Sequence, residues 1–328
     1  MIFRRNGLSI YTSPPSWWYS YTKDKKIIFI FKLIKHIIYS LFFKKKFGGH
    51  YAVTRSLIYG LKSNNIQFDL NSNFIIRSTT IVLSGVDTLQ FAISQKKKGN
   101  IHFLVAGPNI SVLPSFDKNI LAAKEVDICL VPSTWVKEEY EKDCPELLGR
   151  IRIWAAGVDE RYWLPRKKFS FDAPKALIYI KNTDISLNSI EKILKYFKIQ
   201  YKTIYYGKYT SNQYKELLQW CNFVIVLSRS ESQGIALAEA WAMNVPTFSW
   251  NPGKLLYGNH LYLNITSAPY ITAQTGATWK TSHELYALLD KFCKKNTYSP
   301  RSWVLQHMTD SISANELIDI ITLTKTNS

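Results

Sequence analysis

Short apolar runs rich in β-branched residues alternate along the chain with segments of helical period. In the first half, the runs at 8–12, 66–70, 80–84, 101–106, 128–132 and 151–154 predict strands. Helical patterns lie between most of them, among them 51–62, 135–142 and a helix ending near Val126. Strands that alternate with helices in this way predict a parallel sheet covered on both faces.

A second series of the same kind follows a segment at 159–174 that is rich in charge and proline and has no period. We interpret that segment as a linker between two domains. Beyond it, the pattern predicts strands at 176–180, 203–206, 222–227 and 247–250, with helices at 189–197, at 211–220 and from Gly234 onward. Two parallel-sheet units joined by a linker predict a cleft between them, with ligands at the carboxyl ends of the strands.

The segment 26–43 is the longest apolar stretch of the chain. Its length approaches that of a membrane span, but Lys32, Lys35 and His36 sit near its centre and argue against crossing. A polar stripe opposite a broad apolar face suits a buried helix, and it equally suits a helix lying in a membrane interface. Both readings stay open.

Charge narrows the range of partners. The 328 residues carry a formal net charge of +18, much of it in short runs such as 44–46 and 96–98. Such an excess favours nucleic acid, an anionic membrane face or phosphorylated substrates, although a solvated basic surface explains it equally well. The four cysteines are scattered and show no metal-ligand spacing, which indicates a reduced, cytosolic protein without a structural zinc.

The segment 223–250 carries the candidate chemistry. It predicts a buried strand, a polar loop at 228–233 and a helix that begins near Gly234. A glycine there lets the backbone approach a ligand, and the free N–H groups of the helix start suit a diphosphate. Glu231 precedes the helix and Glu239 lies within it, so both carboxylates can face one pocket and accept hydrogen bonds from a vicinal diol. Two acidic residues near a helix start can also serve the helix dipole alone.

The sequence from Glu231 to Glu239 resembles the donor-site motif of GT-B glycosyltransferases of the family 4 type, in which two Glu separated by seven residues follow a strand and a Ser-rich loop. The stretches 226–228 and 240–246 extend this resemblance. Upstream, 130–136 resembles the last strand and helix of the family's N-terminal domain, and 156–165 resembles its entry to the linker. Gly48 and Gly49 resemble its glycine loop.

The resemblance implies an α/β protein of GT-B fold, with two Rossmann-like parallel-sheet domains that face an interdomain cleft. It assigns catalytic roles to Glu231, on hydroxyls of the donor sugar, and to Lys181, on the diphosphate that leaves. Glu239 would bind the ribose, and no metal or other cofactor is expected. The donor-binding set implied in this way is Ser230, Gln233, Gly234, Ile235, Glu239, Gly207, Gly48 and Gly49.

Two positions depart from the family pattern. The family usually has a second Lys several residues after the first basic residue, where this chain has Asn182 to Ser186. It also often has a His at the end of a strand near the sugar, whereas His102 lies at the start of its strand and is interpreted as structural. These departures leave open a catalytically silent relative.

The resulting hypothesis is a retaining transfer of a hexose from a nucleoside diphosphate sugar to a saccharide or lipid-linked acceptor, in the synthesis of surface polysaccharide or glycoconjugate. The expected domains are 1–160 for the acceptor, 161–300 for the donor, and a C-terminal helix within 301–328 that packs back on the first. We expect a cytoplasmic protein without a nucleic-acid partner, and peripheral association with the inner face of an anionic membrane stays open. A basic nucleic-acid-binding protein is the alternative from another class.

Overall fold

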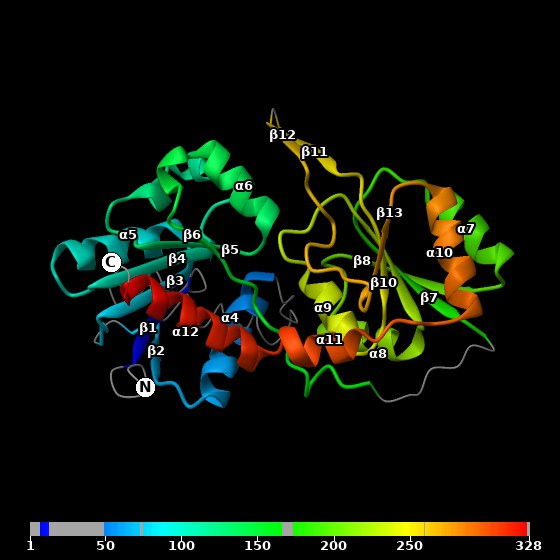
Figure 1. The fold of residues 1–328 in the computed structure, drawn as a ribbon, viewed down its shortest axis with the longest axis horizontal. Coiled ribbons are helices and arrows are strands. Elements are labelled where there is room, and N and C mark those ends of the chain that lie inside the picture. The colour runs from blue at the N-terminus through cyan, green and yellow to red at the C-terminus, as the bar shows by residue number, and fades with distance from the viewer. Residues whose placement is uncertain (1–6, 13–48, 73–74, 166–172, 259, 327–328) are drawn as a thin grey trace, which may run out of the picture.

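The computed structural model describes residues 7–12, 49–72, 75–165, 173–258 and 260–326, so the predicted apolar segment 26–43 and Gly48 lie outside it. Figure 1 shows two lobes side by side, each built on its own sheet. The first lobe holds the N-terminal sheet and the helices around it, and the second lobe holds the C-terminal sheet. Within the described residues, no helix is both long enough and apolar enough to cross a membrane.

The first lobe contains a six-stranded sheet in the order β2-β1-β3-β4-β5-β6, and its strand pairings are parallel. Its strands are β1 (Leu8–Tyr11), β2 (Phe68–Leu70), β3 (Thr79–Ser84), β4 (Phe103–Asn109), β5 (Ile128–Val131) and β6 (Ile151–Ile153). The helices of this lobe are α4 (Gly49–Ser63), α5 (Val86–Lys97) and α6 (Thr134–Asp143). The alternation of strand and helix therefore gives the parallel sheet that the sequence predicts.

Alternating side chains of each strand enter two separate cores. In β3, Ile81 and Leu83 pack on α4, whereas Val82 packs on α5 and α6 from the opposite face. All three side chains are fully buried. Because helices cover both faces of the sheet, β3 and β5 are buried along their whole length.

The second lobe contains a five-stranded parallel sheet in the order β13-β10-β9-β7-β8. Its strands are β7 (Lys175–Asn182), β8 (Gln200–Tyr205), β9 (Phe223–Ser228), β10 (Thr247–Trp250) and β13 (Gly276–Trp279). Helices α7 (Leu187–Tyr196) and α10 (Ser282–Lys294) cover one face, and α8 (Ser211–Trp220), α9 (Ile235–Ala242) and α11 (Pro300–His307) cover the other. The chain builds the sheet outward in opposite directions from β7 and β9, which are neighbours in the sheet. The carboxyl ends of these two parallel strands therefore lie side by side.

The chain passes between the lobes twice, and the two passages are hydrogen-bonded to each other. The N–H of Val158 donates to the carbonyl of Met308 (2.9 Å), and the N–H of Asp310 donates to the carbonyl of Val158 (3.3 Å). After the second passage, α12 (Asp310–Thr326) packs against α4 in the first lobe, where Leu317 and Ile321 are fully buried. The C-terminal helix thus belongs to the core of the N-terminal sheet.

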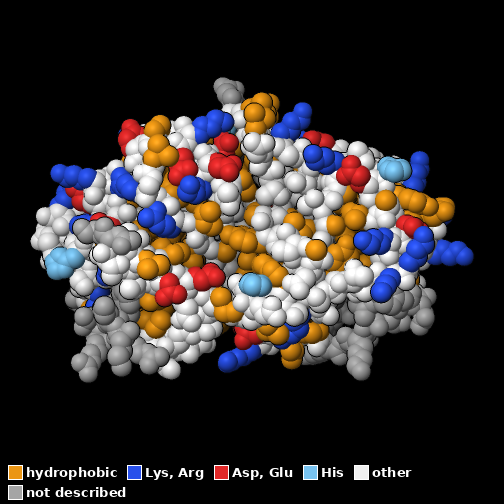
Figure 2. Space-filling view, in the orientation of Figure 1, with side chains coloured by type: hydrophobic (Ala, Val, Ile, Leu, Met, Phe, Trp, Pro, Cys, Tyr) orange, Lys and Arg blue, Asp and Glu red, His pale blue; other side chains and the backbone are white. Residues whose placement is uncertain are grey.

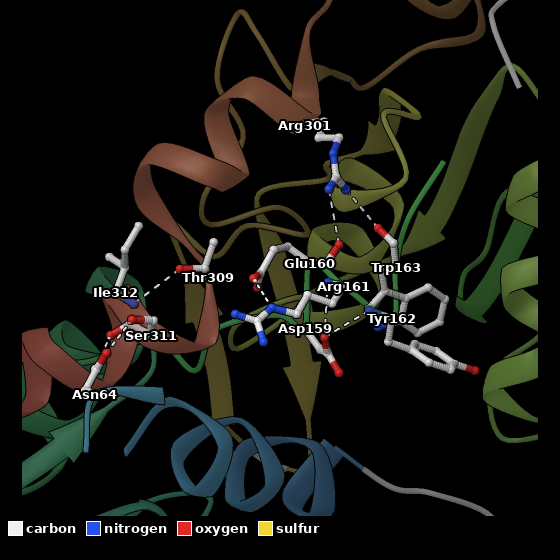
Figure 3. A network of polar contacts seen from close by, with 10 residues as sticks. All are labelled: Asn64, Asp159, Glu160, Arg161, Tyr162, Trp163, Arg301, Thr309, Ser311 and Ile312. Carbon is white, nitrogen blue, oxygen red and sulfur yellow. Dashed lines mark hydrogen bonds and ion pairs between the residues drawn. The ribbon is translucent and has the colours of Figure 1, made fainter. Parts of the chain in front are cut away.

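Figure 3 shows the polar contacts that surround these passages. The guanidinium of Arg301 donates to the carbonyls of Trp163 (3.0 Å) and Glu160 (3.2 Å), and the side chains of Asn64 and Ser311 join α4 to α12. The Arg301 bonds tie helix α11 to the first passage, and the Asn64–Ser311 bonds tie the residue after α4 to the start of α12.

The structure corrects the sequence prediction at two places. Instead of a helix ending near Val126, this region forms short 3-10 turns, because Lys118 and Asn119 both adopt the left-handed conformation and interrupt any longer helix. An antiparallel hairpin of β11 (Lys254–Tyr257) and β12 (His260–Leu263), absent from the prediction, reaches from the second lobe to α6. Its His260 Nε2 lies 3.0 Å from Glu139 Oε2, and Tyr262 packs edge-on against Trp135.

Candidate functional site

A cavity of about 720 Å³ lies between the two lobes. The first lobe contributes residues of α4, Pro108 and Asn109 at the end of β4, and Pro132, which follows β5. The second lobe contributes the end of β7, residues of the segment 206–212 after β8, the loop after β9 and the start of α9. The cavity therefore lies at the carboxyl ends of both parallel sheets, where such folds bind ligands.

An ion pair joins the two residues that the sequence assigns to catalysis. Lys181 is the penultimate residue of β7, and its Nζ lies 2.8 Å from Glu231 Oε2. The ammonium also lies 4.9 Å from the centroid of the Tyr206 ring, on the face that attracts cations. Both Lys181 and Glu231 line the cavity, and Glu231 is buried.

Backbone contacts hold the Glu231 loop in place. The N–H of Glu231 donates to the carbonyl of Thr266 (3.0 Å), and its carbonyl accepts a hydrogen bond from Nε1 of Trp135 in the first lobe (3.0 Å). Ser228 Oγ donates to the carbonyl of Ser230 (2.9 Å) within the loop itself. The position of Glu231 consequently depends on how the first lobe is docked.

Gly234 begins α9 in the left-handed conformation, with φ of 82°, which a residue with a Cβ rarely adopts. No side chain caps this helix start. The first N–H groups of the helix, at Ile235 and Ala236, have no acceptor within the helix and lie at the cavity wall. Uncapped N–H groups at the positive end of a helix favour an anion there.

Glu239 lies one turn into α9 and lines the same cavity. Burial raises the pKa of its carboxyl to about 8, and the charge of Arg55 opposes this rise. Tyrosine side chains lie near the carboxyl, and burial followed by the charge of Glu239 raises the pKa of Tyr162. A carboxyl group held in this way is ready to accept hydrogen bonds from ligand hydroxyls, because such bonds compensate for its lost hydration.

The remaining residues of the predicted donor set occupy different places. Gln233 and Ile235 line the cavity, but the amide of Gln233 is engaged with the backbone N–H and carbonyl of Ala156, at 3.1 and 2.6 Å. Ser230 and Gly207 lie next to the lining residues Glu231 and Tyr206 without bordering the cavity themselves. Gly49 is the first residue of α4, just before the lining residue His50.

Several lining residues were absent from the sequence prediction. Tyr162, Tyr179, Tyr206 and Tyr209 form an aromatic wall on the second lobe, and Arg55 faces the cavity from α4. The amide nitrogen of Asn109 is buried without a hydrogen-bond partner among the described residues. Among these positions, Asn109 lies in the segment 107–109, which the sequence allowed either as a cleft wall or as a simple turn at the end of a strand. No local motif marks Arg55 or the tyrosines, since the fold brings them together from segments far apart in the sequence.

The arrangement suits a ligand that is phosphorylated and rich in hydroxyl groups. The Glu231 carboxylate is paired with Lys181, and Glu239 lies one turn inside α9. The uncapped start of α9 lies between these two glutamates in the sequence. Among the described residues, no three His, Cys, Asp or Glu side chains form a group that could hold a metal ion.

Two parallel-sheet α/β lobes with a cavity between the carboxyl ends of their strands define the GT-B fold. The solved structures that this chain resembles include the lipopolysaccharide outer core galactosyltransferase WaaB in its apo form, at 12% identity and a TM-score of 0.60, over 96% of this chain and 99% of that one. HepE from Anabaena, solved in complex with UDP, has 8% identity and a TM-score of 0.57 over the same shares of the two chains. Sucrose-phosphate synthase from Thermosynechococcus elongatus has 13% identity and a TM-score of 0.50, over 86% and 94%.

Of these three structural neighbours, WaaB is a galactosyltransferase by name. Because the identities are only 8 to 13%, the similarities show the GT-B fold of this chain and nothing finer. The sequence itself matches no family model and no curated protein.

Basic side chains on the face drawn in Figure 2 are spread over both lobes and alternate with acidic ones. A continuous basic stripe, which a nucleic-acid-binding surface would require, is not visible on this face.

Proposed function

We propose that this chain is a glycosyltransferase that moves a hexose from a nucleoside diphosphate sugar to a saccharide or lipid-linked acceptor. The proposal rests chiefly on one observation: Lys181, Glu231, the uncapped start of α9 and Glu239 line a single cavity in a GT-B fold. In this proposal the helix start and Lys181 hold the diphosphate, Glu239 holds the ribose and Glu231 holds hydroxyls of the sugar. Retention of anomeric configuration and independence of metal are parts of the proposal.

The chemistry of each group fits its role. Breaking the bond between sugar and diphosphate leaves negative charge on the departing oxygen, and preorganised N–H groups and an ammonium stabilise that charge. Residues of both lobes line the cavity, so that closure of the lobes on a bound donor would exclude water and protect the donor from hydrolysis. The acceptor would enter from the side of α4 and of the loops after β4 and β5. We place the reaction at the cytoplasmic side, at the inner membrane face when the acceptor is lipid-linked.

Binding of the donor is the first test. UDP-, GDP- and ADP-sugars are screened by thermal unfolding of the purified chain and of Glu239→Ala. One nucleotide class should raise Tm by several degrees, since a ligand at about 100 times Kd adds about 2.7 kcal/mol to the free energy of unfolding. The variant should lose most of this shift, whereas Glu138→Ala, at an exposed position on α6, should keep it.

The outcomes of this screen separate the candidate functions. A folded wild-type chain that no nucleotide sugar stabilises would contradict the proposal and favour a basic polynucleotide-binding protein, whose affinity falls steeply with salt. Donor binding with no sugar transfer to any acceptor, and no slow hydrolysis of the donor, would indicate a catalytically silent relative.

The raised pKa of Glu239, about 8, predicts a pH dependence of donor affinity. The ionised carboxylate accepts two hydroxyl hydrogen bonds, and its population grows as pH rises through 8. Affinity for a nucleotide sugar, which has no phosphate group titrating in this range, should therefore increase between pH 6.5 and 9. Calorimetric titration of Glu239→Gln should give a flat profile. An equal increase in wild type and variant would assign the pH dependence to another group.

A further inference from the structure

Few positively charged side chains face the cavity, and they differ in whether they already form an ion pair. Among the described lining residues, Lys181 and Arg55 are the side chains with permanent positive charge, and burial lowers the pKa of His50. Lys181 is already paired with Glu231 at 2.8 Å. A nucleoside diphosphate sugar brings two negative charges, so Lys181 and the helix start alone leave part of that charge uncompensated.

We propose that Arg55 binds the diphosphate of the donor from across the cavity, so that the anion is held between a cation of each lobe. This inference rests on the proposed function. It assigns a diphosphate-binding residue to the lobe that is expected, from the family resemblance, to bind the acceptor. It also supplies a positive charge in place of the second lysine that is absent after Lys181.

The geometry of α4 directs Arg55 to the cavity. Tyr51, Arg55 and Tyr59 follow one another at intervals of four residues and therefore lie on one face of the helix, and all three line the cavity. The opposite face is fixed, because Val53, Leu57 and Leu61 are buried in the core between the sheet and α12. The helix cannot rotate without exposing that apolar face, so Arg55 is held toward the ligand space.

The guanidinium of Arg55 has unused hydrogen-bonding capacity. Its Nε is buried and has no hydrogen-bond partner among the described residues. An arginine side chain carries five N–H donors in a rigid fork that matches phosphate oxygens, and leaving a buried donor of a charged group unpaired is costly. An anionic ligand in the cavity supplies the missing acceptor.

Electrostatic contacts place Arg55 beside the nucleotide part of the proposed site. Its charge lowers the pKa of Glu239, the residue proposed to hold the ribose, and that of Tyr162 in the opposite wall. The diphosphate of a nucleotide follows directly on the ribose. A cation that lines the same cavity as the ribose-binding carboxylate and interacts with its charge is therefore also placed to bind the phosphate that follows the ribose.

The test compares ligands that share a nucleoside and differ in phosphate. Affinities for UDP, UMP and uridine, or for the GDP or ADP series if the screen selects that base, are measured by calorimetry on wild type, Arg55→Gln and Arg55→Lys. We expect Arg55→Gln to weaken binding of the diphosphate about 10- to 100-fold relative to the nucleoside, as removal of charge-assisted hydrogen bonds does. Arg55→Lys should recover part of the loss.

The ratio of diphosphate to nucleoside affinity is the decisive quantity, because it cancels any effect of Arg55 on ionisation of Glu239. Lys62→Gln removes the same unit of charge from the exposed last turn of α4 and should leave the ratio unchanged. A proportional loss for all three ligands, in variants that keep the wild-type Tm, would overturn the role of Arg55. Failure of the wild type to bind any of the nucleotides would instead contradict the proposed function.

Discussion

Lys181→Ala should lower kcat for sugar transfer by about 100- to 1,000-fold, the range seen when one preorganised group that stabilises developing negative charge is removed. Lys181 lies at the carboxyl end of β7, inside the cavity and 2.8 Å from Glu231. In the proposed reaction its charge acts mainly as the diphosphate leaves, when the negative charge is largest. KM for the donor should therefore change much less than kcat.

The matched control for this prediction lies on the same strand. Lys175→Ala removes a lysine from the amino end of β7, away from the cavity, and should keep kcat within about twofold. Because Lys181→Ala also leaves the buried Glu231 without its partner, the double variant with Glu231→Gln is compared with Glu231→Gln alone. A further loss of kcat in the double variant shows that the effect of Lys181 does not come only from an unpaired carboxylate. A kcat near the wild-type value in Lys181→Ala would remove this residue from the mechanism.

Local sequence patterns predicted the strands and helices closely wherever the hydrophobic period was strong. The prediction for α8 has the observed bounds, and the strand at 247–250 is β10 as predicted. Asn244, just after α9, adopts the left-handed conformation that asparagine commonly adopts at the end of a helix, with φ of 60°. These features depend on neighbouring residues alone, so a single sequence contains the information for them.

The prediction failed where structure depends on contacts between distant segments. The hairpin of β11 and β12 packs its inner face on α6, and the His260–Glu139 pair joins residues 121 positions apart. Its outer face keeps Leu256 and Leu263 exposed, so the alternation of polar and apolar residues that normally reveals a strand is missing.

The candidate site likewise contains residues that the sequence pattern predicts and residues that only the fold brings to the cavity. Glu231, Gly234 and Glu239 belong to one strand-loop-helix unit, whose spacing is visible in the sequence. Arg55 and Trp135 reach that unit from the other lobe, and no periodic pattern connects them to it. Sequence reasoning therefore identified the strand-loop-helix part of the cavity, whereas the aromatic wall of the second lobe and the residues of the first lobe come together only in the fold.

Gly60→Ala should destabilise the chain by about 3 kcal/mol, at the upper end of the usual range for overpacked positions. A Cβ built at Gly60 would lie 2.0 Å from the carbonyl oxygen of Asp310 and 2.6 Å from Cβ of Ala314. Both contacts are with α12 at its closest approach to α4, and neither neighbour is a flexible side chain that could move aside. The two helices must separate, although alanine alone would favour the helix by about 1 kcal/mol.

Denaturant unfolding measures this effect, with Lys62→Ala as an exposed control two residues along the same helix. The control should unfold within about 0.5 kcal/mol of wild type. Since α4 also carries Arg55, Gly60→Ala should weaken nucleoside diphosphate binding even at temperatures where the chain is folded. A variant as stable as wild type would mean that α12 does not pack on α4 as described. A destabilised variant with unchanged nucleotide affinity would separate the stability of this helix pair from the geometry of the site.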